Sequence, residues 1–338
     1  MSEPKKLTEA PKDLKEAIEW VIHIKGHAQE LGKVLEELLK HDGSEVALKV
    51  LDKYRLASKG VISGLAEANL KIQPPTNRFY FAYTALNSLS QGLRPFHSQS
   101  QANINPDDVE KVGKWVSSVQ VNTLTQPIQK FAEGLQTFQK GILTSPSNAT
   151  AYNSAPSWSS LTDSEKRDCA VILLGIMPVV YIAITYLYWQ CAGTGGWAQD
   201  KLNQGGSDQG TLKQYMEALG YQSNQLANKN GSTIISSIMN SMFSGELRTA
   251  YGPSQAHYFN FLKALQNKAI TSIDSPSSPL TSLYLLSYYY TTNFLYTVQS
   301  TSPVTPSFAG YSGVAALAGG AYGFNLGGLG TFVSALLV

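Results

Sequence analysis

Two histidines, His23 and His27, are the first residues to consider for chemistry because they lie four positions apart. On a helix this spacing places two side chains on one face, where they could hold a zinc ion. A zinc protease needs a glutamate next to the first histidine as general base, but Ile24 stands there, and Gly26 is expected to end the helix. We therefore interpret both histidines as polar positions at a helix end and predict no metal site.

Cys169 and Cys191 are the two cysteines of this 338-residue chain. In one straight helix their Cα atoms would lie about 33 Å apart, because each residue advances a helix by about 1.5 Å. A disulfide tolerates only about 4.4–6.8 Å between Cα atoms. A bridge would therefore need Pro178 to break the segment and fold it back. We favour two separate cysteines and keep the disulfide as the alternative.

Other motifs with chemical meaning are weak. Gly319, Gly323 and Gly327 repeat every fourth residue, but the Lys-Ser/Thr pair of a phosphate loop is missing, which argues against a nucleotide site. Such a stripe of small residues lets helices approach closely, either in lipid or in a tight core, and both alternatives stay open. The five histidines form no convincing Ser-His-Asp group. We predict no catalytic residue, no cofactor and no small-molecule substrate.

Two triplets fit the acceptor pattern for N-linked glycosylation. They are Asn148-Ala149-Thr150 and Asn230-Gly231-Ser232. Triplets of this kind arise often by chance. They therefore support the exposure of these loops only weakly.

Charge is scarce and unevenly distributed. Charged residues make up 15% of the chain, against about 25% in typical soluble domains, and residues 275–338 contain no Asp, Glu, Lys, Arg or His. A stretch that long without charge must be buried in a core, pressed against a partner or placed near lipid. A net charge of +2 provides no basic stripe, so we predict no nucleic-acid binding.

Helical periodicity dominates the first half of the chain. The first predicted helix begins at Pro11 and places an apolar stripe opposite Lys12, Lys15 and Glu19. The second predicted helix, at 31–39, is ended by Asp42-Gly43, and a third is predicted at 46–65. A fourth, at 79–93, is ended at Gly92 and Pro95. Two more are predicted, one after the capping residue Asn105 and one at 126–142.

Residues 144–160, rich in Ser, Pro, Asn and Thr, form the clearest linker or loop. Thr162 and Glu165 then match a capping box at the start of an apolar helix, which runs from Cys169 to Cys191. No residue from 171 to 189 is charged, and the length approaches the roughly 20 residues of a membrane span.

Proline and aromatic side chains argue against a membrane role for this apolar helix. Pro178 lies at its centre and the aromatic residues lie along its second half, whereas aromatic residues in membrane helices favour the interfaces. We therefore predict the central helix of a soluble bundle, kinked by Pro178 near the Leu174 carbonyl. Three more helices are predicted, at 211–219, 233–243 and 255–273.

The predicted fold is therefore all-α, a multi-helix bundle with a central apolar helix and long surface loops. Four regions follow from composition. They are a charged N-terminal helical region (1–143), a linker or loop (144–160), an apolar helical core region (161–307) and a glycine-rich apolar C-terminal segment (308–338).

Four stretches of the sequence resemble the variant erythrocyte surface antigens of babesial parasites. They are 10–21, 42–54, the segment from Tyr186 to Trp197 with its Tyr-Leu-Tyr-Trp run, and 283–294 with its tyrosine triplet. The resemblance implies a polymorphic protein on the surface of the infected erythrocyte, exported without a standard N-terminal signal peptide. Larger members of the family have a cysteine-rich portion and end in a membrane span, so this chain resembles a compact member or an ectodomain fragment.

From this resemblance we expect a non-enzymatic surface protein that binds a host cell-surface receptor in adhesion and immune evasion. The receptor is an endothelial adhesion receptor or an inhibitory receptor of immune cells. Rigid helices would present variable loops at 144–160 and 192–210, with Tyr152, Trp158 and Trp197 as binding anchors. Alternatively, these rings cap the core from outside.

Two other classes of function stay open. In the first, a membrane-embedded helical protein would span the bilayer with residues 171–189 and 314–338, and a weaker form of this alternative is membrane association through the C-terminal segment alone. In the second, an intracellular helical scaffold would keep both cysteines reduced and would never reach the cell surface.

Overall fold

Helices make up most of the part of the chain that the computed structural model describes. The described residues are 5–41, 43–71, 80–107, 109–110, 112–113, 125–144, 151–152, 158–192, 201–203 and 212–242. They contain no β-strand and only two isolated β-bridges. The predicted all-α fold is confirmed. The predicted helix at 255–273, the uncharged C-terminal stretch and Trp197 lie outside the described residues.

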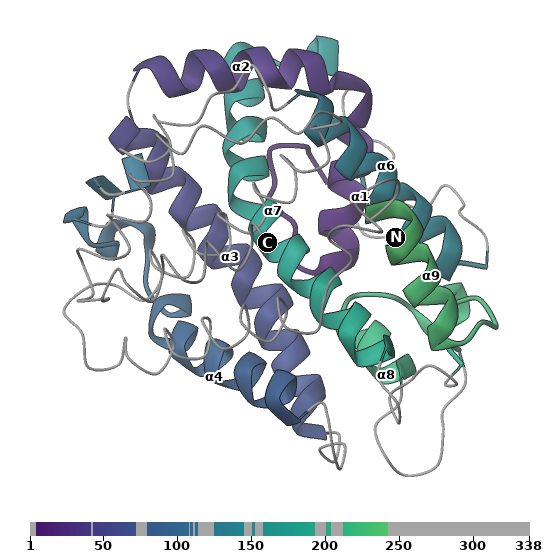
Figure 1. Cartoon of the computed structure of the whole chain (residues 1–338). Coiled ribbons are helices and arrows are strands. Elements are labelled where there is room, and N and C mark those ends of the chain that lie inside the picture. The colour runs from purple at the N-terminus through teal and green to yellow at the C-terminus, as the bar shows by residue number, and fades with distance from the viewer. Residues whose placement is uncertain are drawn as a thin grey trace, which may run out of the picture.

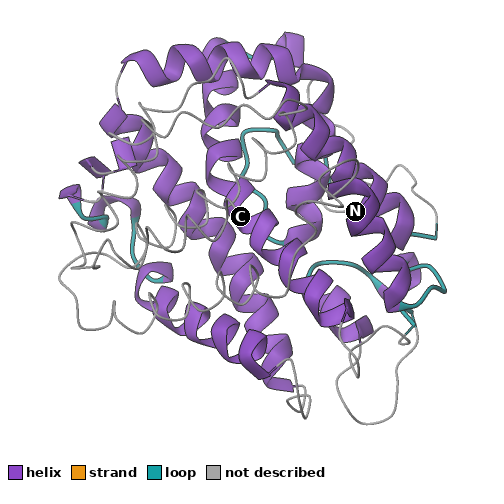
Figure 2. Ribbon diagram, in the orientation of Figure 1, coloured by secondary structure: helices purple, strands orange, loops and turns teal. Residues whose placement is uncertain are grey.

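The first three helices follow one another closely along the chain, and longer stretches of sequence separate the later ones (Figures 1 and 2). In order they are α1 (Leu14–Ile24), α2 (Ala28–His41), α3 (Gly43–Lys71), α4 (Tyr80–His97), α6 (Thr125–Ile142), α7 (Asp163–Ala192), α8 (Leu212–Ala218) and α9 (Gly231–Met242). Short 3₁₀ turns lie at Lys25–His27, Gln101–Asn103, Trp158–Ser160 and Ser223–Gln225.

The long apolar helix α7 lies at the centre of this arrangement. It packs most extensively against α3 and also contacts α1, α2 and α9, which surround it in Figure 1. By length and composition it is the one described helix that could cross a membrane, but 94% of its most apolar window is buried within the chain. The predicted central apolar helix is confirmed, and its burial favours a core helix over a membrane span.

Helices from the predicted N-terminal and core regions share one hydrophobic core. Leu14 and Trp20 of α1, Leu51 of α3 and Ile176 of α7 are all fully buried in the same cluster. The residue boundaries assigned to the four regions stay predictions.

Pro178 lies inside α7 without ending it. Because proline has no amide hydrogen to donate to the carbonyl of Leu174, and its ring crowds that carbonyl, the helix should bend there. Figure 1 shows α7 changing direction part-way along its length. The helix stays continuous, so Cys169 and Cys191 lie buried near its opposite ends and no disulfide joins them.

The start of α7 has the predicted capping box. The Thr162 amide donates to Glu165 Oε2 at 2.8 Å, and the Glu165 amide donates to Thr162 Oγ1 at 3.3 Å. The Thr162 hydroxyl also donates to Glu165 Oε2, at 2.9 Å, and the hydrogen bonds from the amide and the hydroxyl of Thr162 lower the pKa of Glu165. This helix start was predictable because both partners are local in sequence.

The predicted end of the fourth helix is wrong. The sequence suggested a stop at Gly92 and Pro95, but α4 continues to His97 with Pro95 inside it. Leu93, Phe96 and His97 are all buried. Their packing holds the last turn in helical form in spite of the proline.

Gly175 lies where α7 packs closely against α3. A Cβ atom at this position would lie 2.6 Å from Lys53 Cβ and 2.9 Å from the amide nitrogen of Tyr54. Real Cβ atoms do not come this close to backbone atoms. Glycine is therefore required for the two helices to pack at this distance.

Substituting this glycine gives the first test. Alanine in a helix is normally more stable than glycine by about 0.5–1 kcal/mol, but at 175 the added methyl group meets the α3 backbone. We expect Gly175→Ala to lower the free energy of unfolding by about 1–3 kcal/mol, seen as a lower urea midpoint. Gly26→Ala is the control, because nothing lies within 4 Å of a Cβ there. A midpoint for the Gly175 variant at or above that of wild type would contradict the close packing.

Candidate functional site

The two predicted recognition loops are tied to the helical framework at points that the structure describes. We call residues 144–160 the first loop and residues 192–210 the second loop. The junction segment, residues 225–230, connects α8 to α9 and contacts both loops. Its hydrogen bonds fix one point of each loop to the framework.

The first loop begins beside the junction segment. The amide of Thr144 donates to the carbonyl of Gln225 at 2.9 Å, and the amide of Ala227 donates to the carbonyl of Ile142 at 2.9 Å. The Lys229 ammonium also donates to a carbonyl in the last turn of α6, that of Gly141, at 2.9 Å. The end of α6 and the start of the first loop are therefore fixed to this segment.

The second loop is held at its middle by the same segment. The amide of Leu202 donates to the carbonyl of Lys229 at 2.7 Å, and Lys201 forms an antiparallel bridge with Asn230. The Leu202 side chain is fully buried. Both loops are therefore attached to one short stretch of backbone.

The first loop has a second attachment, at residues 151–152. The Lys5 amide donates to the Ala151 carbonyl at 3.1 Å, and the Tyr152 hydroxyl donates to the Glu9 carbonyl at 3.4 Å. The Tyr152 side chain is fully buried. Burial raises its pKa, and the nearby carboxylates of Glu16 and Glu19 on α1 add to this shift.

The end of the first loop is also packed inward. Trp158 is 1% exposed and stacks on His27, with ring centroids 5.6 Å apart and planes 12° apart. Tyr152 and Trp158 are thus core residues in this structure, which favours the packing alternative considered for them. Their role in partner binding stays a prediction, as does that of Trp197.

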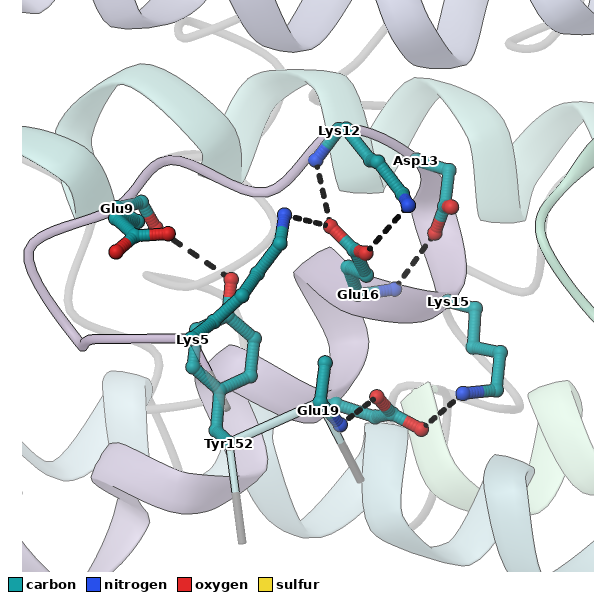
Figure 3. Close-up of polar contacts among 9 residues, drawn as sticks. Lys5, Glu9, Lys12, Asp13, Lys15, Glu16, Glu19 and Tyr152 are labelled. Carbon is teal, nitrogen blue, oxygen red and sulfur yellow. Dashed lines mark hydrogen bonds and ion pairs between the residues drawn. The ribbon is translucent and has the colours of Figure 1, made fainter. Parts of the chain in front are cut away.

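A cluster of paired charges on α1 holds the N-terminal segment and the first loop together (Figure 3). Glu16 accepts from the Lys5 ammonium at 2.5 Å and from the Lys12 amide at 3.0 Å, and the Lys12 ammonium lies 3.3 Å from its other oxygen. Burial alone would raise the pKa of Glu16. The hydrogen bonds from Lys5 and Lys12 outweigh burial and lower it.

Glu19 is the carboxylate that reaches the first loop directly. It accepts from the Lys15 ammonium at 2.6 Å and from the Ala151 amide at 3.0 Å, and it is 2% exposed. The prediction that placed Glu19 on a solvated polar face is therefore wrong. The segment 5–10 and residues 151–152 cover this side of α1, so the carboxylate lies between α1 and the loop.

A serine and histidine group between α3 and α4 has the residue types of a nucleophilic site but not the geometry. Ser58 Oγ donates to the carbonyl of Arg55 at 3.0 Å, so its single proton is not directed at His97 Nε2, 3.1 Å away. The ring must therefore donate to Ser58, the reverse of nucleophile activation. Its other nitrogen lies 3.4 Å from Ser63 Oγ.

Burial lowers the pKa of His97 to about 4, and the positive charges of Lys59 and Arg55 add to this shift. The ring is 7% exposed and Ser58 is fully buried. No substrate could reach that hydroxyl in this conformation. The group is a packed polar contact that ties the last turn of α4 to α3.

Metal and substrate sites have little support among the described residues. In the stretches that the structure covers, no three or more His, Cys, Asp or Glu side chains gather to hold a metal ion. His27, half of the histidine pair, stacks on Trp158. A cleft of about 410 Å³ between α3 and α8 is lined by Gly64, Glu67, Ala68, Gln214, Glu217 and Ala218. Its lining includes two exposed carboxylates, those of Glu67 and Glu217, together with small residues.

Comparison with known proteins supplies the family. Residues 117–262 match the family model described as Variant erythrocyte surface antigen-1. The chain carries a variant erythrocyte surface antigen-1 domain. The family predicted from the sequence is confirmed for this segment, which makes up less than half of the chain. No curated protein and no solved structure matched the chain.

The matched segment contains both candidate loops, α7, the junction segment and α9. Of the four stretches that carried the resemblance, the one from Tyr186 to Trp197 lies within it. The other three, 10–21, 42–54 and 283–294, lie outside it.

Glu19 provides a test of the attachment of the first loop. Glu19→Gln removes a buried charge from Lys15, and we expect the free energy of unfolding to fall by about 2–4 kcal/mol. Glu45→Gln is the matched control, because the Lys49–Glu45 pair has the same 2.6 Å distance and four-residue spacing but exposed side chains. It should cost about 1 kcal/mol or less. If urea unfolding gave the same loss of unfolding free energy for both variants, burial of Glu19 would add nothing to the stability of the chain.

The depressed pKa of His97 predicts a pH dependence. Below pH 6.5 the unfolded chain takes up a proton on His97, whereas the folded chain does so only near pH 4, so stability is lost as pH falls through this window. We expect a loss on the order of 3 kcal/mol. His97→Gln should flatten the curve of unfolding free energy against pH between these limits. Parallel curves for wild type and variant would contradict the buried neutral ring.

Proposed function

We propose that this variant erythrocyte surface antigen is a non-enzymatic protein that binds host cell-surface receptors, in adhesion and in immune evasion. It acts on the extracellular face of the infected erythrocyte. The receptor is an endothelial adhesion receptor or an inhibitory receptor on immune cells. Binding uses the first and second loops, which the helical framework presents together.

The observation that carries this proposal is the shared attachment of both loops to the junction segment. Thr144 and Leu202 each donate a backbone hydrogen bond to a carbonyl in residues 225–229. Two loops that are attached to the same short segment can form one continuous contact surface. A receptor would then touch both loops in a single interface.

The kind of attachment also fits a protein that varies in sequence. Backbone-to-backbone hydrogen bonds need no particular side chain, so these anchors tolerate most substitutions in the loops. The core around α7 is separate from the loop positions that would change. A rigid framework with variable loops is how proteins alter recognition without losing their fold.

The test is a binding screen of the purified full chain against ectodomains of endothelial adhesion receptors and inhibitory immune receptors. We expect one of them to bind, and replacement of residues 145–150 or 204–210 by Gly and Ser to weaken that binding at least about tenfold, or about 1.4 kcal/mol. Lys33→Ser with Glu37→Ser, two exposed positions on α2, is the control and should bind as wild type.

The proposal would be contradicted if none of the receptors bound the chain, or if both loop variants bound as tightly as wild type. Helix content and urea midpoint of each variant must match those of wild type, so that loss of binding is not loss of fold. Antibody labelling of intact infected erythrocytes separates surface display from an intracellular scaffold, which would stay unlabelled.

A further inference from the structure

One sequence motif has side chains with no part in loop attachment or receptor binding as described so far, although the backbone of Asn230 bridges to Lys201. The triplet Asn230-Gly231-Ser232 lies at the junction between residues 225–230 and α9. Around it, Asn228, Lys229 and Ser232 are exposed. Asn230 itself is half-exposed.

The side-chain amide of Asn230 is held in one orientation. Its Oδ1 accepts a short hydrogen bond from Ser232 Oγ and a second one from Thr233 Oγ1 at 3.4 Å. The Thr233 amide donates to the Asn230 carbonyl at 3.0 Å, which turns the backbone tightly at this point. The carboxamide oxygen therefore faces the start of α9, and the amide nitrogen points the other way.

The amide nitrogen of Asn230 is accessible to solvent. Among the described residues, no hydrogen bond holds it, and it is not one of the buried polar atoms that lack a partner. A nitrogen without a partner that is not buried must face water. The acceptor nitrogen of Asn230 and the hydroxyl of the exposed Ser232 thus lie together at the surface, on either side of the buried Gly231.

We propose that Asn230 is an acceptor for N-linked glycosylation. In this reaction the amide nitrogen forms a bond to the anomeric carbon of a sugar carried on a polyprenyl diphosphate. The bond between that carbon and the diphosphate oxygen breaks, the lipid diphosphate leaves with the electron pair, and the nitrogen loses one proton. An oligosaccharyltransferase of the secretory pathway catalyses this transfer, and the acceptor pattern requires the hydroxyl of Ser232.

A glycan at Asn230 would cover the place where the junction segment holds both loops. Its attachment point is next to Lys229, whose carbonyl holds the second loop. The sugar would shield the backbone anchors while the outer parts of the loops stay accessible. This inference requires passage through the secretory pathway, as surface display does, but it does not depend on receptor binding.

The experiment expresses the full chain behind a cleavable signal peptide in cultured eukaryotic cells. We expect a mass increase that peptide N-glycosidase removes, with conversion of Asn230 to a heavy-oxygen aspartate when the enzyme acts in H₂¹⁸O. Asn230→Gln and Ser232→Ala should abolish the modification at this site. Ser232→Thr is the matched control and should retain it. All measurements use Asn148→Gln as background, which removes the other acceptor triplet.

An unmodified peptide at 230 in that background, in cells that glycosylate a reference glycoprotein, would overturn the proposal. Retention of the glycan in Ser232→Ala would also overturn it. The glycosylated chain should keep the helix content and urea midpoint of the unglycosylated one, because the nitrogen faces water, and a misfolded glycosylated product would contradict the geometry. Receptor binding by Asn230→Gln is measured separately, so failure of either inference leaves the other testable.

Discussion

The burial of α7 is the constraint on which the rest of this structure depends. Every position from 170 to 180 is buried, so this helix has no solvated face and must be covered on all sides. Burying a large apolar side chain contributes about 1.5–3 kcal/mol, and α7 contributes many such side chains. The helices α1, α2, α3 and α9 supply the cover. Their positions follow from α7 rather than from their own propensities.

The first loop is attached to this framework by two kinds of contact with different tolerance to sequence change. At the junction segment the contacts join backbone to backbone and survive most substitutions. At Ala151 the contact depends on the buried carboxylate of Glu19, which in turn depends on Lys15. Loss of either side chain would leave a buried polar group without its partner. Variation in the loop is therefore compatible with the fold, whereas variation of the charged residues on α1 is not.

Features with local causes could be predicted from the sequence. The end of the second helix at His41, the capping box of Thr162 and the continuous apolar run of α7 each depend on residues close together in the chain, and all three occur in the structure. Features that depend on residues far apart in the chain could not be predicted. The burial of Glu19 requires the segment 5–10 and Ala151, and the extension of α4 through Pro95 requires its packing against α3.

The candidate site shows the same division. The sequence identified both loops by composition but not their attachment, because Thr144, Leu202 and the junction segment are far apart in the chain and their bonds involve backbone atoms. It also ranked Tyr152 and Trp158 as binding anchors, since aromatic residues in loops are typical of binding sites. The composition of the loop could have corrected this ranking. Two aromatic residues in an otherwise polar loop are also what a loop needs to fold back onto a core.

The extent of the family match leads to a conclusion about the folding unit. Residues 117–262 include α7, but α3, its most extensive packing partner, lies outside this segment, as do α1 and α2. Without these three helices a large part of the α7 surface would face water, which costs about 25 cal/mol for each Å² of apolar surface exposed. The matched segment therefore cannot form this core alone. The N-terminal helices belong to the same folding unit as the loops that they hold in place.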